Sequence, residues 1–154
     1  MKATYPKTKA AGVFNVLSSF ACLIAIAVIA YLLFTNQFKI VKEEEAQNFA
    51  NLGLIVVVPF TLLHLAVLFI GFLTQLLRGL KLKSASEDGE IGIASYIVTL
   101  IVKILCLAYY IFICYLFLDV AVGGATVLIL TSIVIVTMLF TMIFEFACKS
   151  EVLD

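Results

Sequence analysis

The sequence predicts an all-α integral membrane protein, a four-transmembrane-helix bundle built from two antiparallel hairpins. Three observations support this fold class. Hydrophobic residues make up 64% of the 154 residues and charged residues only 13%, whereas soluble domains are about half apolar and about one quarter charged. The apolar residues are gathered into four long runs. Nearly all charged residues lie between or outside these runs, so we expect lipid to be the solvent for most of the chain.

Each apolar run is long enough to cross a bilayer, because about 20 helical residues at about 1.5 Å per residue cover a hydrocarbon core of about 30 Å. The first run, Ala10–Phe34, follows three lysines, as the apolar part of a secretory signal does, but it is too long for one. We interpret it as an uncleaved first span. The chain is then a single membrane domain, residues 1–154, with spans at residues 11–34, 51–77, 96–120 and 125–147.

The connections between the spans differ in length and in charge. Residues 35–50 contain too few apolar side chains for a span, and we expect a short helix at the interface followed by a solvated acidic turn at Glu43–Glu45. A cation-collecting mouth is the alternative role for these carboxylates. Residues 78–95 are expected to form a second, polar loop. Gly123 and Gly124 predict a sharp turn, which would pack the third and fourth spans as a tight hairpin.

Positive charge is distributed unevenly over the two sides of the predicted topology. Cytoplasmic loops of membrane proteins carry an excess of Lys and Arg. With a cytoplasmic N-terminus, the inner segments hold Lys2, Lys7, Lys9, Arg78, Lys81, Lys83 and Lys149, and the outer loops hold only Lys39 and Lys42. We therefore expect four spans with the N- and C-termini both cytoplasmic, and we place the protein in the plasma membrane.

One full charge, Lys103, lies well inside a predicted span. An unpaired ammonium in the hydrocarbon core costs at least about 2.5 kcal/mol. Glu145 of the fourth span lies at a similar depth, near the same cytoplasmic end. We predict that Lys103 and Glu145 pair or share a water-filled cytoplasmic vestibule. The alternative is that Lys103 extends its stem to the headgroups while Glu145 already lies at the interface.

The second span contains Pro59 and His64. Proline removes a backbone donor and clashes with the carbonyl one turn earlier, so a helix kink is expected between Ile55 and Pro59. His64, near the middle of the span, has two interpretations. It is either a proton relay or pH switch on a transport pathway, or a neutral side chain hydrogen-bonded to a neighbour such as Tyr109, Tyr110 or Thr137. The second is favoured, because no carboxylate lies at the same depth.

The remaining intramembrane polar candidates are Tyr109 and Tyr110. Both lie at mid-membrane, where their hydroxyls need hydrogen-bond partners. Asn15 and Gln75, in contrast, lie near the predicted cytoplasmic helix ends, where we expect water to reach them. The intramembrane polar residues to be explained are therefore His64, Lys103, Tyr109, Tyr110 and Glu145.

Several classes of function are disfavoured by what the sequence lacks. The four cysteines form no CxxC, and with a single histidine there is no basis for a metal site. No zinc-protease, nucleophile-elbow or phosphate-loop motif occurs. The formal net charge is zero, which gives no basic surface for nucleic acid. We therefore expect a protein that is not an enzyme and needs no cofactor.

Two functional hypotheses remain. The first is a non-enzymatic structural or regulatory subunit whose apolar faces bind the lipid bilayer and either another membrane protein or further copies of itself. The second is a small oligomeric channel or transporter that uses the Pro59/His64 kink and Lys103. A conduction path needs rings of carbonyls, hydroxyls or charges. Because intramembrane polar residues are sparse, the first hypothesis is favoured.

Overall fold

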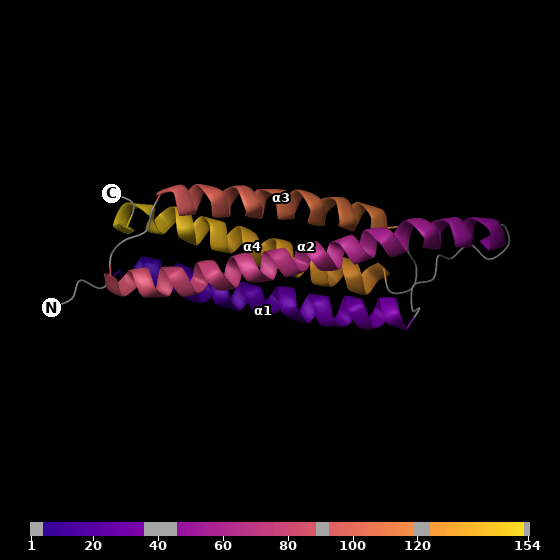
Figure 1. Ribbon diagram of the computed structural model, residues 1–154, viewed down its shortest axis with the longest axis horizontal. Coiled ribbons are helices and arrows are strands. Elements are labelled where there is room, and N and C mark those ends of the chain that lie inside the picture. Colours follow the sequence, from indigo (N-terminus) through magenta and orange to yellow (C-terminus); the bar gives the residue numbers. More distant parts are fainter. Residues whose placement is uncertain (1–4, 36–45, 89–92, 119–123, 153–154) are drawn as a thin grey trace.

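The described part of the chain is entirely helical apart from helix-terminal residues. A computed structural model describes residues 5–35, 46–88, 93–118 and 124–152. These residues form four α-helices, which lie side by side in an elongated bundle (Figure 1): α1 (Pro6–Phe34), α2 (Ala46–Asp88), α3 (Ile93–Phe117) and α4 (Gly124–Val152). Each contains a stretch long and apolar enough to cross a membrane. The prediction of an all-α protein with four such helices is confirmed.

The second helix extends well beyond the predicted span. Residues 78–88 were expected to begin a polar loop, but α2 continues through them to Asp88. The apolar side chains of Leu82 and Ala85 explain this difference, because they recur at helical spacing and pack with Ala11 of α1. At the other end of α2, residues 36–45 lie outside the described residues. The proposed interfacial helix and the Glu43–Glu45 turn therefore fall largely in a segment of which nothing is described.

Each helix packs against two others, in the order α1, α2, α3, α4 and back to α1. The contact between α1 and α2 is the most extensive, and α3 makes the least contact with its neighbours. The α3–α4 contact, expected to be tight, is the smallest of the four. A short connection constrains only the ends that it joins, so the packing along the rest of two helices depends on their side chains.

Two glycines explain why α1 and α2 approach so closely. A Cβ atom placed on Gly12 would lie 2.9 Å from the carbonyl oxygen of Gly79, and one on Gly79 would lie 2.8 Å from the carbonyl oxygen of Gly12. Such distances are too short for any real side chain, and the atoms in the way belong to the backbone. The two helices therefore pack backbone against backbone, as small residues permit in membrane proteins.

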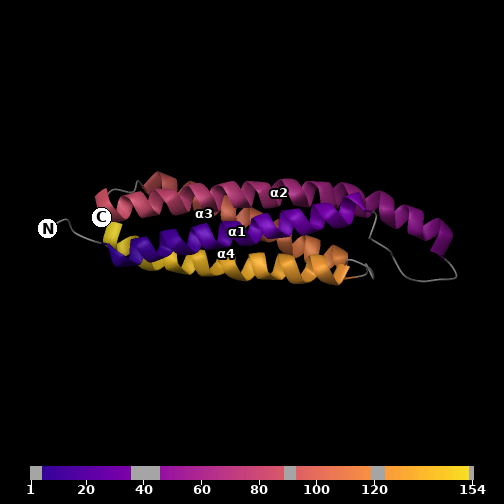
Figure 2. The same ribbon diagram turned by 90° about the horizontal axis from the view of Figure 1, so that it is seen from below.

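The helices alternate in direction, so one end of the bundle gathers four helix termini. The beginnings of α1 and α3 lie there with the ends of α2 and α4 (Figures 1 and 2). Contacts between Phe14 and Phe144, and between Arg78 and Ser95, link these termini. We call this end of the bundle the polar end.

At the opposite end, the N-terminal part of α2 projects beyond the other helices. The helix continues through Pro59 without interruption. Figure 2 shows this projecting part turned away from the axis of the rest of α2. The kink expected near Pro59, where proline removes a backbone hydrogen bond, stays a prediction.

Candidate functional site

A cluster of charged and polar side chains lies buried near the polar end, and Lys103 of α3 is at its centre. Its ammonium donates hydrogen bonds to Glu145 Oε1 at 2.7 Å, to Asn15 Oδ1 at 2.7 Å and to Thr141 Oγ1 at 3.1 Å. These three bonds use all three of its donors. Lys103 is only 1% exposed. It therefore pairs with Glu145, as expected, and its ammonium is directed into the bundle.

Glu145 contacts a second cation, which the sequence did not suggest. Its Oε2 atom lies 3.5 Å from Nε of Arg78 on α2, and the Glu145 and Arg78 side chains are each 3% exposed. Arg78 was expected in a solvated loop, but it lies on the helix and points into the bundle. Helical periodicity explains this, because Arg78 lies one turn from the buried residues Gln75 and Leu82. Two cations and one carboxylate leave the cluster with one formal positive charge.

Local helix geometry positions Asn15, Thr141 and Glu145 within the cluster. Thr141 and Glu145 are four residues apart on α4, so they lie on the same face of the helix. Asn15 Nδ2 donates to the carbonyl oxygen of Ala11 at 2.9 Å, which leaves Oδ1 to accept from Lys103. We call Asn15, Arg78, Lys103, Thr141 and Glu145 the charge cluster. Four helices contribute to it, so it fixes how they are rotated about their axes.

Further polar contacts follow toward the middle of the bundle. Ser18 donates to Thr137 at 3.1 Å, which links α1 to α4. Beyond this contact the interior becomes apolar, with Leu68 and Met138 fully buried. Tyr110 lies in this apolar layer, where its hydroxyl donates to the carbonyl oxygen of Val67 at 3.3 Å.

His64 lies on the far side of that apolar layer. Its Nε2 atom lies 3.1 Å from Oγ1 of Thr131 on α4. Tyr109, Tyr110 and Thr137 were the examples named for such a partner, and the observed partner is a different hydroxyl on α4. From the sequence, these three residues were expected at about the depth of His64 along the helices. The helices are rotated so that the hydroxyls of these three residues form hydrogen bonds with other groups. Among the described residues, Tyr109 donates to the carbonyl oxygen of Phe60 at 2.9 Å and forms only a ring contact with His64.

Gln75 and Asn15 were both expected to reach water, and both are fully buried. Asn15 belongs to the charge cluster. Gln75 differs, because neither its amide nitrogen nor its amide oxygen has a hydrogen-bond partner among the described residues. An unsatisfied buried polar group costs about 1–3 kcal/mol. Gln75 is therefore a source of instability within the helix that also supplies Arg78.

Replacing Gln75 with leucine is expected to stabilise the protein, by about 1 kcal/mol. The substitution removes the unsatisfied amide and keeps most of the side-chain volume. Thermal unfolding of the detergent-solubilised protein measures this effect. The matched control is Asn15→Leu, which removes an amide that is bonded and is expected to destabilise. A lower melting temperature for Gln75→Leu would contradict the expectation.

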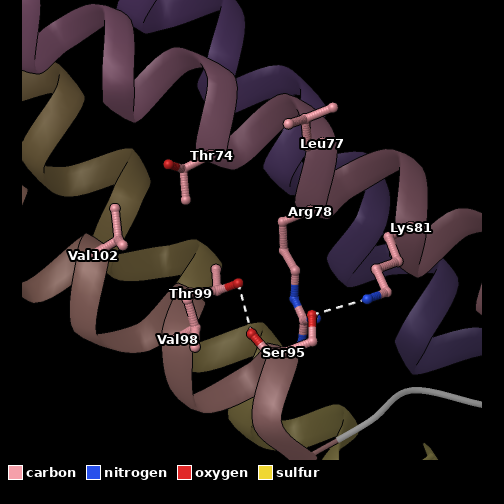
Figure 3. Close-up of a pocket in the computed structure, with 8 residues that line it drawn as sticks. All are labelled: Thr74, Leu77, Arg78, Lys81, Ser95, Val98, Thr99 and Val102. Atoms are coloured by element: carbon pink, nitrogen blue, oxygen red, sulfur yellow. Dashed lines mark hydrogen bonds between the residues drawn. The ribbon is translucent and has the colours of Figure 1, made fainter.

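A pocket of about 220 Å³ opens beside the charge cluster, between α2 and α3. Figure 3 shows Arg78 and Lys81 reaching from α2 toward Ser95 at the beginning of α3. Arg78 Nη1 and Lys81 Nζ both donate to the hydroxyl oxygen of Ser95, at 3.2 and 3.0 Å. Arg78 thus links the buried charge cluster to the surface of the bundle.

These observations define a class: a protein whose described residues form four helices apolar enough to cross a membrane, with a buried ion cluster near one end. Among the residues that the structure describes, no group of three or more His, Cys, Asp or Glu side chains could hold a metal ion. No known family model matches the chain, and no significant similarity to a curated protein or to a solved structure was found.

Proposed function

We propose that the chain is a non-enzymatic integral membrane protein that acts as a structural or regulatory partner-binding subunit. One observation carries the proposal. Charged and polar side chains of the four helices turn inward and bond to one another, whereas large apolar side chains cover the outside of the bundle. The outward faces of such a protein interact with lipid and with other apolar helices. The polar interior serves to fix the bundle.

The proposed arrangement is two antiparallel hairpins with both termini cytoplasmic, in the plasma membrane. Support comes from the positive residues Arg78, Lys81 and Lys83, which lie at the polar end together with the beginning of α1 and the end of α4. Membrane proteins retain positive charge on the cytoplasmic side. The polar end is then the cytoplasmic end.

The alternative function, a small oligomeric channel or transporter, has one observation in its favour. The charge cluster, the Ser18–Thr137 contact and the His64–Thr131 contact follow one another along the bundle. The buried apolar layer around Leu68 separates His64 from the other two. Within one copy of the chain, this layer argues against a continuous polar path.

Site-specific photocrosslinking in the native membrane tests the subunit proposal. A benzophenone amino acid at Leu105, on the exposed face of α3, is expected to give a discrete protein adduct because α3 makes the least contact within the bundle. The control is the same probe at Leu107, which faces the interior. Probes at exposed positions on the other helices (Leu17, Phe69 and Ile133) map the interface.

Ion flux in proteoliposomes distinguishes the two hypotheses. The subunit proposal predicts flux equal to that of protein-free vesicles. Flux that is lost in His64→Ala or Lys103→Met would establish the channel or transporter instead. Lipid adducts alone at every outward position would contradict the partner-binding role.

A further inference from the structure

The pocket between α2 and α3 brings two cationic side chains to one neutral oxygen. Arg78 and Lys81 both donate to one neutral oxygen, the Ser95 hydroxyl. Arg78 is 4% exposed, and its Nε atom lacks a hydrogen-bond partner among the described residues and makes only the 3.5 Å ion-pair contact to Glu145. None of the described residues that line the pocket is acidic. An anion would supply the oxygens that these donors lack.

The backbone at this place also favours an anion. Ser95 lies in the first turn of α3, where backbone N–H groups have no partner within the helix and the helix dipole is positive. The neighbouring charge cluster has one net positive charge, because its carboxylate neutralises only one of its two cations. Lys81 adds another positive charge. A dianionic or monoanionic oxygen group placed beside Ser95 would meet both side-chain and backbone donors.

The other wall of the pocket is apolar and opens toward the outside of the bundle. Leu77 and Val98 line it and are 63% and 60% exposed. In Figure 3 they lie on opposite helices, at the margins of the group formed by Arg78 and Ser95. At about 220 Å³ the pocket is smaller than the roughly 300–1,000 Å³ that holds a drug-sized ligand. It suits a compact anionic group attached to an apolar chain.

We propose that this pocket binds the phosphate of an anionic phospholipid. Arg78, Lys81 and the Ser95 hydroxyl hold the phosphate oxygens, and the acyl chains follow the exposed surfaces of Leu77 and Val98. The position at the end of the apolar spans is the depth of lipid headgroups, where basic side chains bind anionic lipids. This site is independent of the partner-binding role, because it requires neither a protein partner nor ion flux.

Native mass spectrometry of the full chain in mild detergent tests the proposal. Phosphatidylglycerol is titrated against phosphatidylcholine for the wild type, Lys81→Gln and Ser95→Ala. The matched control is Lys83→Gln, which removes an exposed lysine two residues away that does not line the pocket. We expect Lys81→Gln to weaken phosphatidylglycerol binding about fivefold, Ser95→Ala to weaken it by a smaller factor, and Lys83→Gln to change it less than twofold.

Three results would overturn the proposal. Equal losses in Lys81→Gln and Lys83→Gln would mean diffuse attraction to surface charge. Equal binding of phosphatidylcholine would mean that the lipid is held by its chains. Displacement of phosphatidylglycerol by an equal concentration of inorganic phosphate would assign the pocket to free phosphate. Circular dichroism spectra that match the wild type verify that Lys81→Gln and Ser95→Ala remain folded.

Discussion

Glu145→Gln is expected to destabilise the protein more than any other single substitution in the charge cluster, by about 3–5 kcal/mol. The amide keeps the shape of the side chain but removes the only carboxylate that contacts Lys103 and Arg78 among the described residues. Two buried cations would then lie near one another without an anion. The expected loss is measured as the shift in the unfolding free energy in mixed micelles.

Lys103→Met is expected to cost less, about 1–2 kcal/mol. It leaves a neutral Arg78–Glu145 pair and deprives Asn15 and Thr141 of a hydrogen-bond donor. The double substitution of Glu145→Gln and Lys103→Met should therefore be more stable than Glu145→Gln alone, because it has one buried cation fewer. Lys83→Met, on the exposed surface, is the control and should change stability by less than about 0.5 kcal/mol.

This order of effects depends on Arg78. Were Glu145 paired with Lys103 alone, removing either partner would cost about the same, and the double substitution would recover most of the loss in both cases. Equal losses for Glu145→Gln and Lys103→Met would show that Arg78 does not share the carboxylate. Wild-type stability for all three variants would show that the ion pair does not form.

Gly79→Ala is expected to destabilise the protein, by up to about 2 kcal/mol after the gain in helix propensity is subtracted, although alanine is the better helix former. Replacing glycine by alanine within a helix normally gains about 1 kcal/mol. Here the added methyl group would lie 2.8 Å from the carbonyl oxygen of Gly12 and 2.7 Å from Cγ2 of Val16. The valine methyl can move, but the carbonyl moves only if α1 and α2 separate, and overpacking of this kind costs about 1–3 kcal/mol.

Combining the substitutions at Gly79 and Gly12 is a second test of this contact, because each alone would force α1 and α2 apart. Gly12→Ala meets the same obstruction from the other helix, so the two substitutions together should cost clearly less than the sum of their separate effects. Leu80→Ala, at the neighbouring exposed position, is the control and should leave the unfolding free energy nearly unchanged. A gain in stability for Gly79→Ala would contradict the backbone-to-backbone contact.

Much of the fold and part of the site could be predicted because a helix that crosses lipid must consist almost entirely of apolar residues. A charge within an apolar run stands out, and Lys103 and Glu145 were identified in this way. Their pairing followed from depth alone, since antiparallel helices bring the two residues to the same end. Arg78 gave no such signal. It follows the second apolar run, where Arg and Lys usually mark the beginning of a cytoplasmic loop.

Rotation about the helix axis accounts for the other differences. The sequence gives the depth of His64, Thr131, Asn15 and Gln75 but not the neighbour that each one faces. A rotation of one residue, about 100° on an ideal helix, exchanges an interior position for a lipid-facing one. The actual partner of His64 and the burial of Gln75 therefore depended on contacts with other helices.

By itself the sequence predicted the helical class and the four helices that, among the described residues, are long and apolar enough to cross a membrane, because these follow from hydropathy summed over consecutive residues. Only the tertiary structure decided that Glu145 is shared by two cations, that Gly12 and Gly79 bring α1 against α2, and that a cationic pocket opens between α2 and α3. The physical reason is that these features arise between residues far apart in the chain, and they exist only when four helices have fixed rotations and separations.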